Sequence, residues 1–84
     1  MLYLLGFLYL DFAGRADYLL THGRYVASRS EDHFEVQLYW TKNFFAEVYH
    51  SRRSGRNEQI NALTEEPDFT AYLDQISLEN LQIQ

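Results

Sequence analysis

The sequence predicts an α+β domain in which an antiparallel meander of three or four strands lies between an amino-terminal and a carboxy-terminal helix. Three observations lead to this fold class. Residues 11–22 and 64–76 place apolar side chains at helical spacing, whereas residues 24–50 contain three segments rich in β-branched and aromatic residues. No repeat, linker or low-complexity segment interrupts the 84 residues, so we expect a single domain over residues 1–84.

The first ten residues, MLYLLGFLYL, are uncharged and almost entirely apolar. A helix that crosses a membrane needs ~20 apolar residues, and Asp11 ends this run too early for a membrane span. The run also lacks the basic start of a secretory signal. Three interpretations remain: a buried strand or helical turn, an extension from a start codon placed too early, or an interface segment between subunits.

The first predicted helix begins at Asp11 and ends near His22. Four apolar side chains define its expected buried face: Phe12, Ala16, Leu19 and Leu20. Gly23 follows as a C-cap, since glycine adopts the left-handed backbone conformation without a side-chain clash. We expect His22 to interact with the negative end of the helix dipole rather than to take part in catalysis.

Three strand segments follow, RYVASR, HFEVQLYW and FFAEVYH, and the turn residues SED and TKN separate them. A three-residue loop at TKN, with Asn43 in the left-handed conformation, places Val36 opposite Val48. A two-residue loop places Leu38 opposite Glu47 and divides the apolar residues, so burial favours the three-residue register. The buried face predicted by that register contains Phe34, Val36, Leu38, Trp40, Phe44, Ala46 and Val48.

The opposite face of the predicted sheet combines aromatic and polar side chains. Tyr39, Phe45 and Tyr49 are expected to cluster there as a contact surface for a protein partner or a second copy of the chain. Glu35 and Glu47 are expected to stay hydrated at its rim. The alternative is that the amino-terminal segment or the first helix covers these aromatic side chains.

The segment SRRSGR at residues 51–56 is a predicted loop that contains Arg52, Arg53 and Arg56. Clustered guanidinium groups recognise phosphate or carboxylate through paired hydrogen bonds, so an anion site is one interpretation of this loop. The other is that these charges serve solubility or pair with the acidic carboxy-terminal helix. Beyond the loop, NEQINAL permits a helix, but we prefer a fourth strand that returns beside FFAEVYH.

The carboxy-terminal helix is predicted to begin at Thr64 as its N-cap, with Pro67 near the start. Its expected buried stripe consists of Phe69, Tyr72, Leu73 and Ile76. The following SLENLQ is expected to add a short final turn.

The order YLLTHGRYVASR, FEVQLYWTKNFFAEVYH, NEQINAL and FTAYLDQISL, over about residues 18–81, resembles short bacterial proteins of unknown function. Those proteins share a layout of helix, antiparallel sheet and closing helix. The resemblance therefore implies the fold and no activity. Residues 1–10 lie outside it.

Composition and motifs restrict the function. The net charge of −5 argues against nucleic acid and anionic membranes as partners, and the absence of cysteine fits a reducing, cytoplasmic compartment. Phosphate-binding glycine loops, nucleophile elbows and metal-protease helices are missing from the sequence. His33 and His50 belong to opposite faces of the predicted sheet, so we expect no metal site and no cofactor. An acid and base pair of Glu35 and Glu47 would need a pocket, and a solvated face is favoured instead.

We therefore expect a small cytoplasmic protein without enzymatic activity that acts as an interaction or regulatory module, with another protein or as a homodimer. The first alternative is an anion or small-ligand binding protein that uses the arginine-rich loop. A small hydrolase is the third class.

Overall fold

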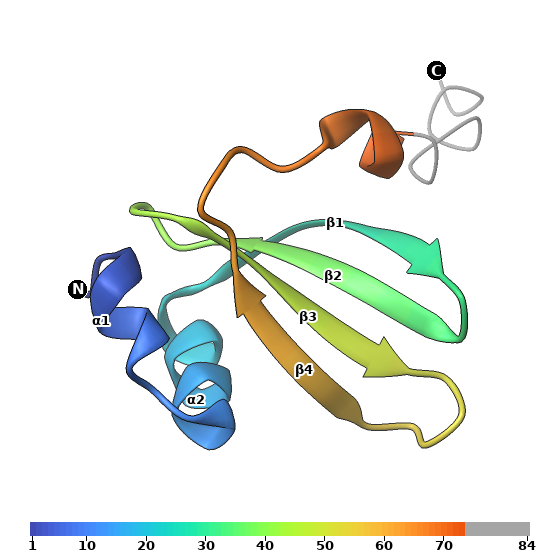
Figure 1. The fold of residues 1–84 in the computed structure, drawn as a ribbon, viewed down its shortest axis with the longest axis horizontal. Coiled ribbons are helices and arrows are strands. Elements are labelled where there is room, and N and C mark those ends of the chain that lie inside the picture. Colours follow the sequence, from blue (N-terminus) through green and yellow to red (C-terminus); the bar gives the residue numbers. More distant parts are fainter. Residues whose placement is uncertain (74–84) are drawn as a thin grey trace.

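The computed structural model describes residues 1–73, which form two helices, a four-stranded antiparallel sheet and a final helical turn (Figure 1). The elements are α1 Leu4–Leu8, α2 Phe12–His22, β1 Arg24–Glu31, β2 Phe34–Trp40, β3 Phe45–Ser51, β4 Asn57–Ala62 and the turn at residues 69–73. The strands lie in the order β1-β2-β3-β4, each antiparallel to the next. The predicted α+β meander is therefore confirmed, with a fourth strand.

The helix α2 begins and ends where the sequence predicts. The Asp11 side chain accepts a hydrogen bond of 2.8 Å from the Gly14 N–H and caps the first turn. At the other end, Gly23 has φ −85° and ψ 150°, so the predicted left-handed C-cap is wrong. Glycine is needed there because a Cβ atom would lie 2.6 Å from the carbonyl oxygen of Leu19.

The predicted buried face of α2 is only partly correct. Leu19 is buried and Ala16 lies beside it against the sheet, but Phe12 and Leu20 are exposed. Tyr18, which the pattern did not include, packs against the same core. The helix therefore rests on the sheet through a narrower strip than its apolar residues predict.

Residues 1–10 contain the short helix α1, so of the three interpretations the structure shows a helical turn. Phe7 is fully buried, and its ring centroid lies 4.9 Å from that of Phe44 and 5.8 Å from that of Tyr18. The segment is also tied down by its backbone, because the Leu2 N–H donates to the Tyr18 hydroxyl and the Asn43 side chain donates to the Leu2 carbonyl. This segment is part of the folded unit.

The register of the central hairpin differs from the predicted one. The Thr41 N–H donates to the Phe44 carbonyl at 3.1 Å, which leaves Lys42 and Asn43 as a two-residue turn. Lys42, with φ 85°, takes the positive φ that the prediction assigned to Asn43. Trp40 consequently pairs with Phe45, and each residue of β2 lies opposite a partner one position later than predicted.

This register distributes the apolar side chains over both faces of the sheet. One face packs on the two helices, and its cluster contains Phe7, Leu19, Phe44, Ala46, Val48 and Ile60. The other face packs under the final helical turn through Ala27, Leu38 and Tyr72. Figure 1 shows α1 and α2 on one side of the sheet and the turn on the other. The predicted single buried face is therefore wrong.

The final helical turn begins later than predicted. Asp68, rather than Thr64, accepts a hydrogen bond of 3.1 Å from the Thr70 N–H at its start. The later start has a local cause, because the Leu63 N–H donates to the Phe45 carbonyl and so continues the strand pairing. Of the predicted buried stripe, Tyr72 is buried, Phe69 and Leu73 are exposed, and Ile76 lies outside the described residues, as does SLENLQ.

One arginine joins both helices to the sheet. The Arg15 side chain donates to the carbonyl oxygens of Leu10 and Leu8, both at 3.0 Å, and to that of Ile60 at 2.8 Å. Its guanidinium carbon also lies 5.6 Å from the ring centroid of Phe7. The side chain of Arg15 thus connects α1, α2 and β4.

No helix among residues 1–73 has the length and apolar character needed to cross a membrane.

A double-mutant cycle distinguishes the observed register from the predicted one. Val36 and Val48 are both buried but lie on opposite faces, so Val36→Ala and Val48→Ala should each lower the free energy of unfolding by about 1–3 kcal/mol. Their effects should add to within about 0.5 kcal/mol, because the two side chains share no cavity. Urea denaturation of both single variants and the double variant measures this. A coupling above that value would favour the register in which the two valines are opposite.

Candidate functional site

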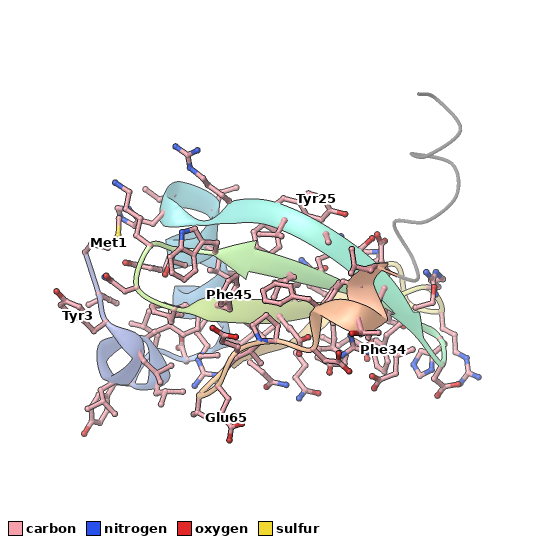
Figure 2. The ribbon with its side chains drawn as sticks, turned by 90° about the horizontal axis from the view of Figure 1, so that it is seen from above. Met1, Tyr3, Tyr25, Phe34, Phe45 and Glu65 are labelled. Carbon is pink, nitrogen blue, oxygen red and sulfur yellow. The ribbon has the colours of Figure 1, made fainter. Side chains whose placement is uncertain are left out.

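The structure does not bring the three predicted interface aromatics together. Phe45 and Tyr49 lie on the face covered by the final turn, whereas Tyr39 lies on the face covered by the helices. The predicted cluster is therefore wrong, because the register shift moves Tyr39 away from the other two. Figure 2 shows Phe45 near the middle of its sheet face. The role of these residues in binding a partner stays a prediction.

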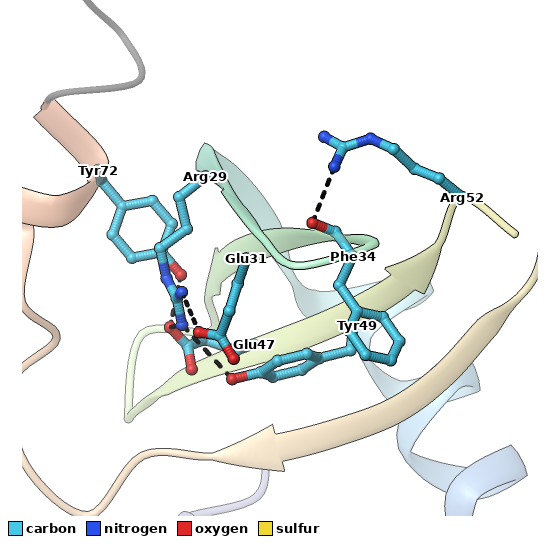
Figure 3. Close-up of polar contacts among 7 residues, drawn as sticks. All are labelled: Arg29, Glu31, Phe34, Glu47, Tyr49, Arg52 and Tyr72. Carbon is cyan, nitrogen blue, oxygen red and sulfur yellow. Dashed lines mark hydrogen bonds and ion pairs between the residues drawn. The ribbon is translucent and has the colours of Figure 1, made fainter.

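A buried polar network occupies the face that contains Phe45. The Tyr72 hydroxyl donates to Glu47 Oε2 at 2.5 Å, and Arg29 Nη2 lies 3.4 Å from the same oxygen (Figure 3). Arg29 Nη1 also donates to Glu31 at 2.5 Å. Glu47 is 8% exposed and Tyr72 is 2% exposed, so the link between them is shielded from water. The expectation that Glu47 stays hydrated at a rim is wrong.

The charges of this network explain its protonation states. Burial raises the pKa of Tyr72, and the hydrogen bond to Glu47 raises it further, so the hydroxyl keeps its proton at alkaline pH values where an exposed tyrosine ionises. Burial alone lowers the pKa of Arg29, but its hydrogen bond to Glu31, its contact with Tyr72 and the attraction of Glu47 outweigh that effect. The net result is a raised pKa for Arg29. The network therefore holds residues 69–73 on the sheet through the Glu47 carboxylate, which accepts a hydrogen bond from Tyr72 and forms an ion pair with Arg29.

The arginine loop is partly used by the fold itself. Arg52 donates through Nη1 to the Phe34 carbonyl and through Nη2 to the Ser30 hydroxyl, both at 3.0 Å, and its N–H donates to the His33 carbonyl. Figure 3 shows the side chain of Arg52 reaching back toward Phe34. Arg53 and Arg56 are exposed. Anion binding by Arg52, Arg53 and Arg56 stays a prediction, with Arg52 already bonded to protein acceptors.

Two of the three histidines, His33 and His50, lie in polar contacts near the hairpin ends. His33 Nδ1 lies 3.3 Å from Asp32, and His50 Nδ1 lies 2.8 Å from Asn57 Oδ1. Over residues 1–73, no three side chains of the types His, Cys, Asp and Glu are grouped so that they could hold a metal ion.

A cavity of about 370 Å³ lies between α2 and the sheet. Its lining residues are Ala16, Leu19, Leu20, Gly23, Tyr25, Tyr39, Val48, Asn57 and Ile60. Tyr25 and Tyr39 pack edge to face with their ring centroids 5.9 Å apart. Burial raises the pKa of Tyr39, helped by Tyr25 and Glu35, and its hydroxyl donates to Gln37 at 3.3 Å. Sequence reasoning missed this cavity because its walls come from all four strands and a helix.

Among residues 1–73, the largest run of exposed apolar side chains lies at the amino terminus. We define the amino-terminal apolar surface as Met1, Tyr3, Leu5, Leu8, Tyr9 and Phe12. Tyr9 is 90% exposed and Tyr3 is 73% exposed. Figure 2 shows Met1 and Tyr3 at one end of the molecule, away from the centre of the sheet. In the sequence, this surface is signalled by the uncharged run of residues 1–10. An interface segment between subunits is one of the three interpretations of that run given above.

Removing the Tyr72 hydroxyl should weaken the buried network. Tyr72→Phe leaves the Glu47 carboxylate with one hydrogen-bond donor fewer, so we expect the free energy of unfolding to fall by about 1–3 kcal/mol. The matched control is Tyr9→Phe, which removes a hydroxyl from a side chain that is 90% exposed and should have little effect. Urea denaturation measures both variants. Equal stabilities for the two variants would contradict the importance of this hydrogen bond.

Tyr72 also predicts a response to alkaline pH. Because burial raises its pKa above the ordinary value of 10.0, the unfolded chain loses this proton before the folded chain does. The stabilisation from Tyr72 is therefore complete below pH 10 and declines as the pH rises further. Between about pH 10 and 11, the free energy of unfolding should fall more steeply in the parent than in Tyr72→Phe. Parallel pH profiles for the two proteins would exclude this linkage.

Comparison with known proteins identifies no relative of this chain. No family model matches it, no curated protein is similar in sequence, and no solved structure is similar in fold.

Proposed function

We propose that this chain is a non-catalytic protein interaction module that forms a homodimer through its amino-terminal apolar surface. One observation carries the proposal: six large apolar side chains are exposed within twelve consecutive residues. Soluble monomers rarely leave such a group of apolar side chains in water, and apolar patches of this kind mark contact surfaces.

Contacts with the rest of the domain hold the segment that carries this surface in a fixed conformation. Phe7 anchors α1 in the core, while Asn43 and Tyr18 hold the backbone of Leu2 through hydrogen bonds. The exposed side chains therefore project from a segment that is already ordered. Binding therefore orders little additional backbone and loses little conformational entropy, which favours association through a small interface.

The charge distribution supports a second copy as the partner. The chain has a net charge of −5, so two copies repel each other at most surfaces. Residues 1–10 contain no charged side chain, and two such segments can approach without that repulsion. A twofold dimer also needs only one self-complementary surface. The amino-terminal apolar surface has no charged side chain among its members, which supports its use in such a contact.

Molecular mass by light scattering tests the homodimer. The parent should have twice the chain mass of 10.0 kDa at micromolar concentrations, and Leu5→Ser combined with Tyr9→Ser should reduce it to the chain mass. Both side chains are exposed, so the double variant should keep the fold. The matched control is Leu20→Ser, which alters a side chain that is 86% exposed on α2 and should remain dimeric.

Two results would contradict the proposal. A dimer that survives the double substitution would place the interface elsewhere. A parent that is monomeric in solution but sediments with phosphatidylcholine vesicles would show that the amino-terminal apolar surface contacts lipid instead of a second copy.

A further inference from the structure

The cavity between α2 and the sheet is a second feature, separate from the proposed dimer surface. We propose that it binds an uncharged, mostly apolar small molecule, the size of one or two fused rings, that carries one hydrogen-bond acceptor. This binding site goes beyond the proposed function and uses none of the residues of the amino-terminal apolar surface.

The size and position of the cavity argue for an occupant. At about 370 Å³ it lies within the range of small-molecule sites, which is roughly 300–1,000 Å³. Its floor consists of Leu19, Val48 and Ile60, which are core residues. These floor side chains are buried, whereas Leu20 and Tyr25 at the entrance are exposed, so the space opens to solvent beside the core. An apolar ligand packs on the exposed side chains and displaces water from this space.

The lining determines the polarity of the ligand. None of its nine residues is charged, so a ligand ion would lose its hydration without gaining a paired charge. The T-shaped pair of Tyr25 and Tyr39 forms an aromatic wall suited to another ring. An uncharged molecule with an aromatic or similarly flat apolar body is therefore favoured.

One edge of the cavity supplies a hydrogen-bond donor. His50 Nδ1 lies 2.8 Å from Asn57 Oδ1, and the Nδ1–H tautomer donates to that oxygen. The amide oxygen of Asn57 is thus engaged, and its NH₂ group is the part that can serve a ligand. Since an NH₂ group donates, the complementary ligand atom is an acceptor.

The entrance of the cavity is lined by side chains that a ligand would cover. Leu20 is 86% exposed and Tyr25 is 57% exposed, although both line the cavity. A bound apolar molecule removes part of these side chains from water, which adds to its affinity. Gly23 lines the cavity at the end of α2, where a Cβ atom would lie 2.6 Å from the carbonyl oxygen of Leu19 in the same helix.

The test uses 2-naphthol as the probe and follows backbone amides of the full chain by NMR. Saturable shifts are expected at lining residues such as Ala16, Gly23 and Asn57. Ala16→Leu fills part of the cavity and should weaken binding by at least about tenfold, while Asn57→Ala should weaken it by about threefold to tenfold through loss of the donor. Asn57 is exposed, so this second variant remains informative if Ala16→Leu is poorly folded.

Two controls separate a site from general adhesion to apolar surfaces. Tyr9→Ser alters the amino-terminal apolar surface but no lining residue, and its affinity should match that of the parent. The anion 2-naphthoate has a similar ring system and should bind at least about tenfold more weakly, because no cation lines the cavity. Absence of saturable shifts, unchanged affinity in both cavity variants, equal binding of naphthoate, or loss of binding in Tyr9→Ser would each overturn the proposal.

Discussion

The two-residue turn at Lys42 and Asn43 sets the register of β2 against β3, and the rest of the structure depends on that register. In a strand, successive side chains point to opposite faces, so a shift of one residue moves every side chain of β2 relative to its neighbours on β3. The observed pairing places Leu38 opposite Glu47 and sends Val48 to the other face. Neither face is then polar enough to be left in water. The sheet needs a cover on both sides, and the chain supplies α1 and α2 on one side and Tyr72 on the other.

The elements were predictable because their signals are local. Asp11 marks the start of α2 as an N-cap, and Gly23 marks its end, although glycine is required there by a close approach to Leu19 rather than by its backbone angles. The first three strands follow from runs of aromatic and β-branched residues, and the fourth from the return of the chain after the arginine loop. The register is not predictable by the same means, because burial selects one register only when a single face of the sheet is covered. In this chain residues 1–8 and 69–73, which are remote in sequence, cover opposite faces.

The candidate sites follow the same rule: features that depend on neighbouring residues were predictable, and contacts between residues remote in sequence were not. The aromatic cluster and the hydrated Glu47 were both derived from the register, and both failed with it. The partner of Glu47 is the hydroxyl of Tyr72, 25 residues later, and no spacing in the sequence connects the two. The arginine loop was located correctly, but the sequence did not show that Arg52 already bonds to Phe34 and Ser30. The uncharged run at the amino terminus was the signal that led to an exposed surface.

The contact between Arg15 and Ile60 has a consequence for solubility. The Leu63 N–H donates to the Phe45 carbonyl, and since hydrogen-bonded pairs alternate along an antiparallel ladder, the Ile60 carbonyl points outward from the edge strand β4. Outward carbonyls on an edge are templates on which another chain can add a strand and start aggregation. Arg15 occupies this one while it also holds the carbonyls of Leu8 and Leu10. A foreign strand would have to displace Arg15 Nη1–H from the Ile60 carbonyl before it could extend the sheet here, while the bonds to Leu8 and Leu10 hold the guanidinium in place. The side chain that joins the helices to β4 therefore also blocks strand addition at this edge.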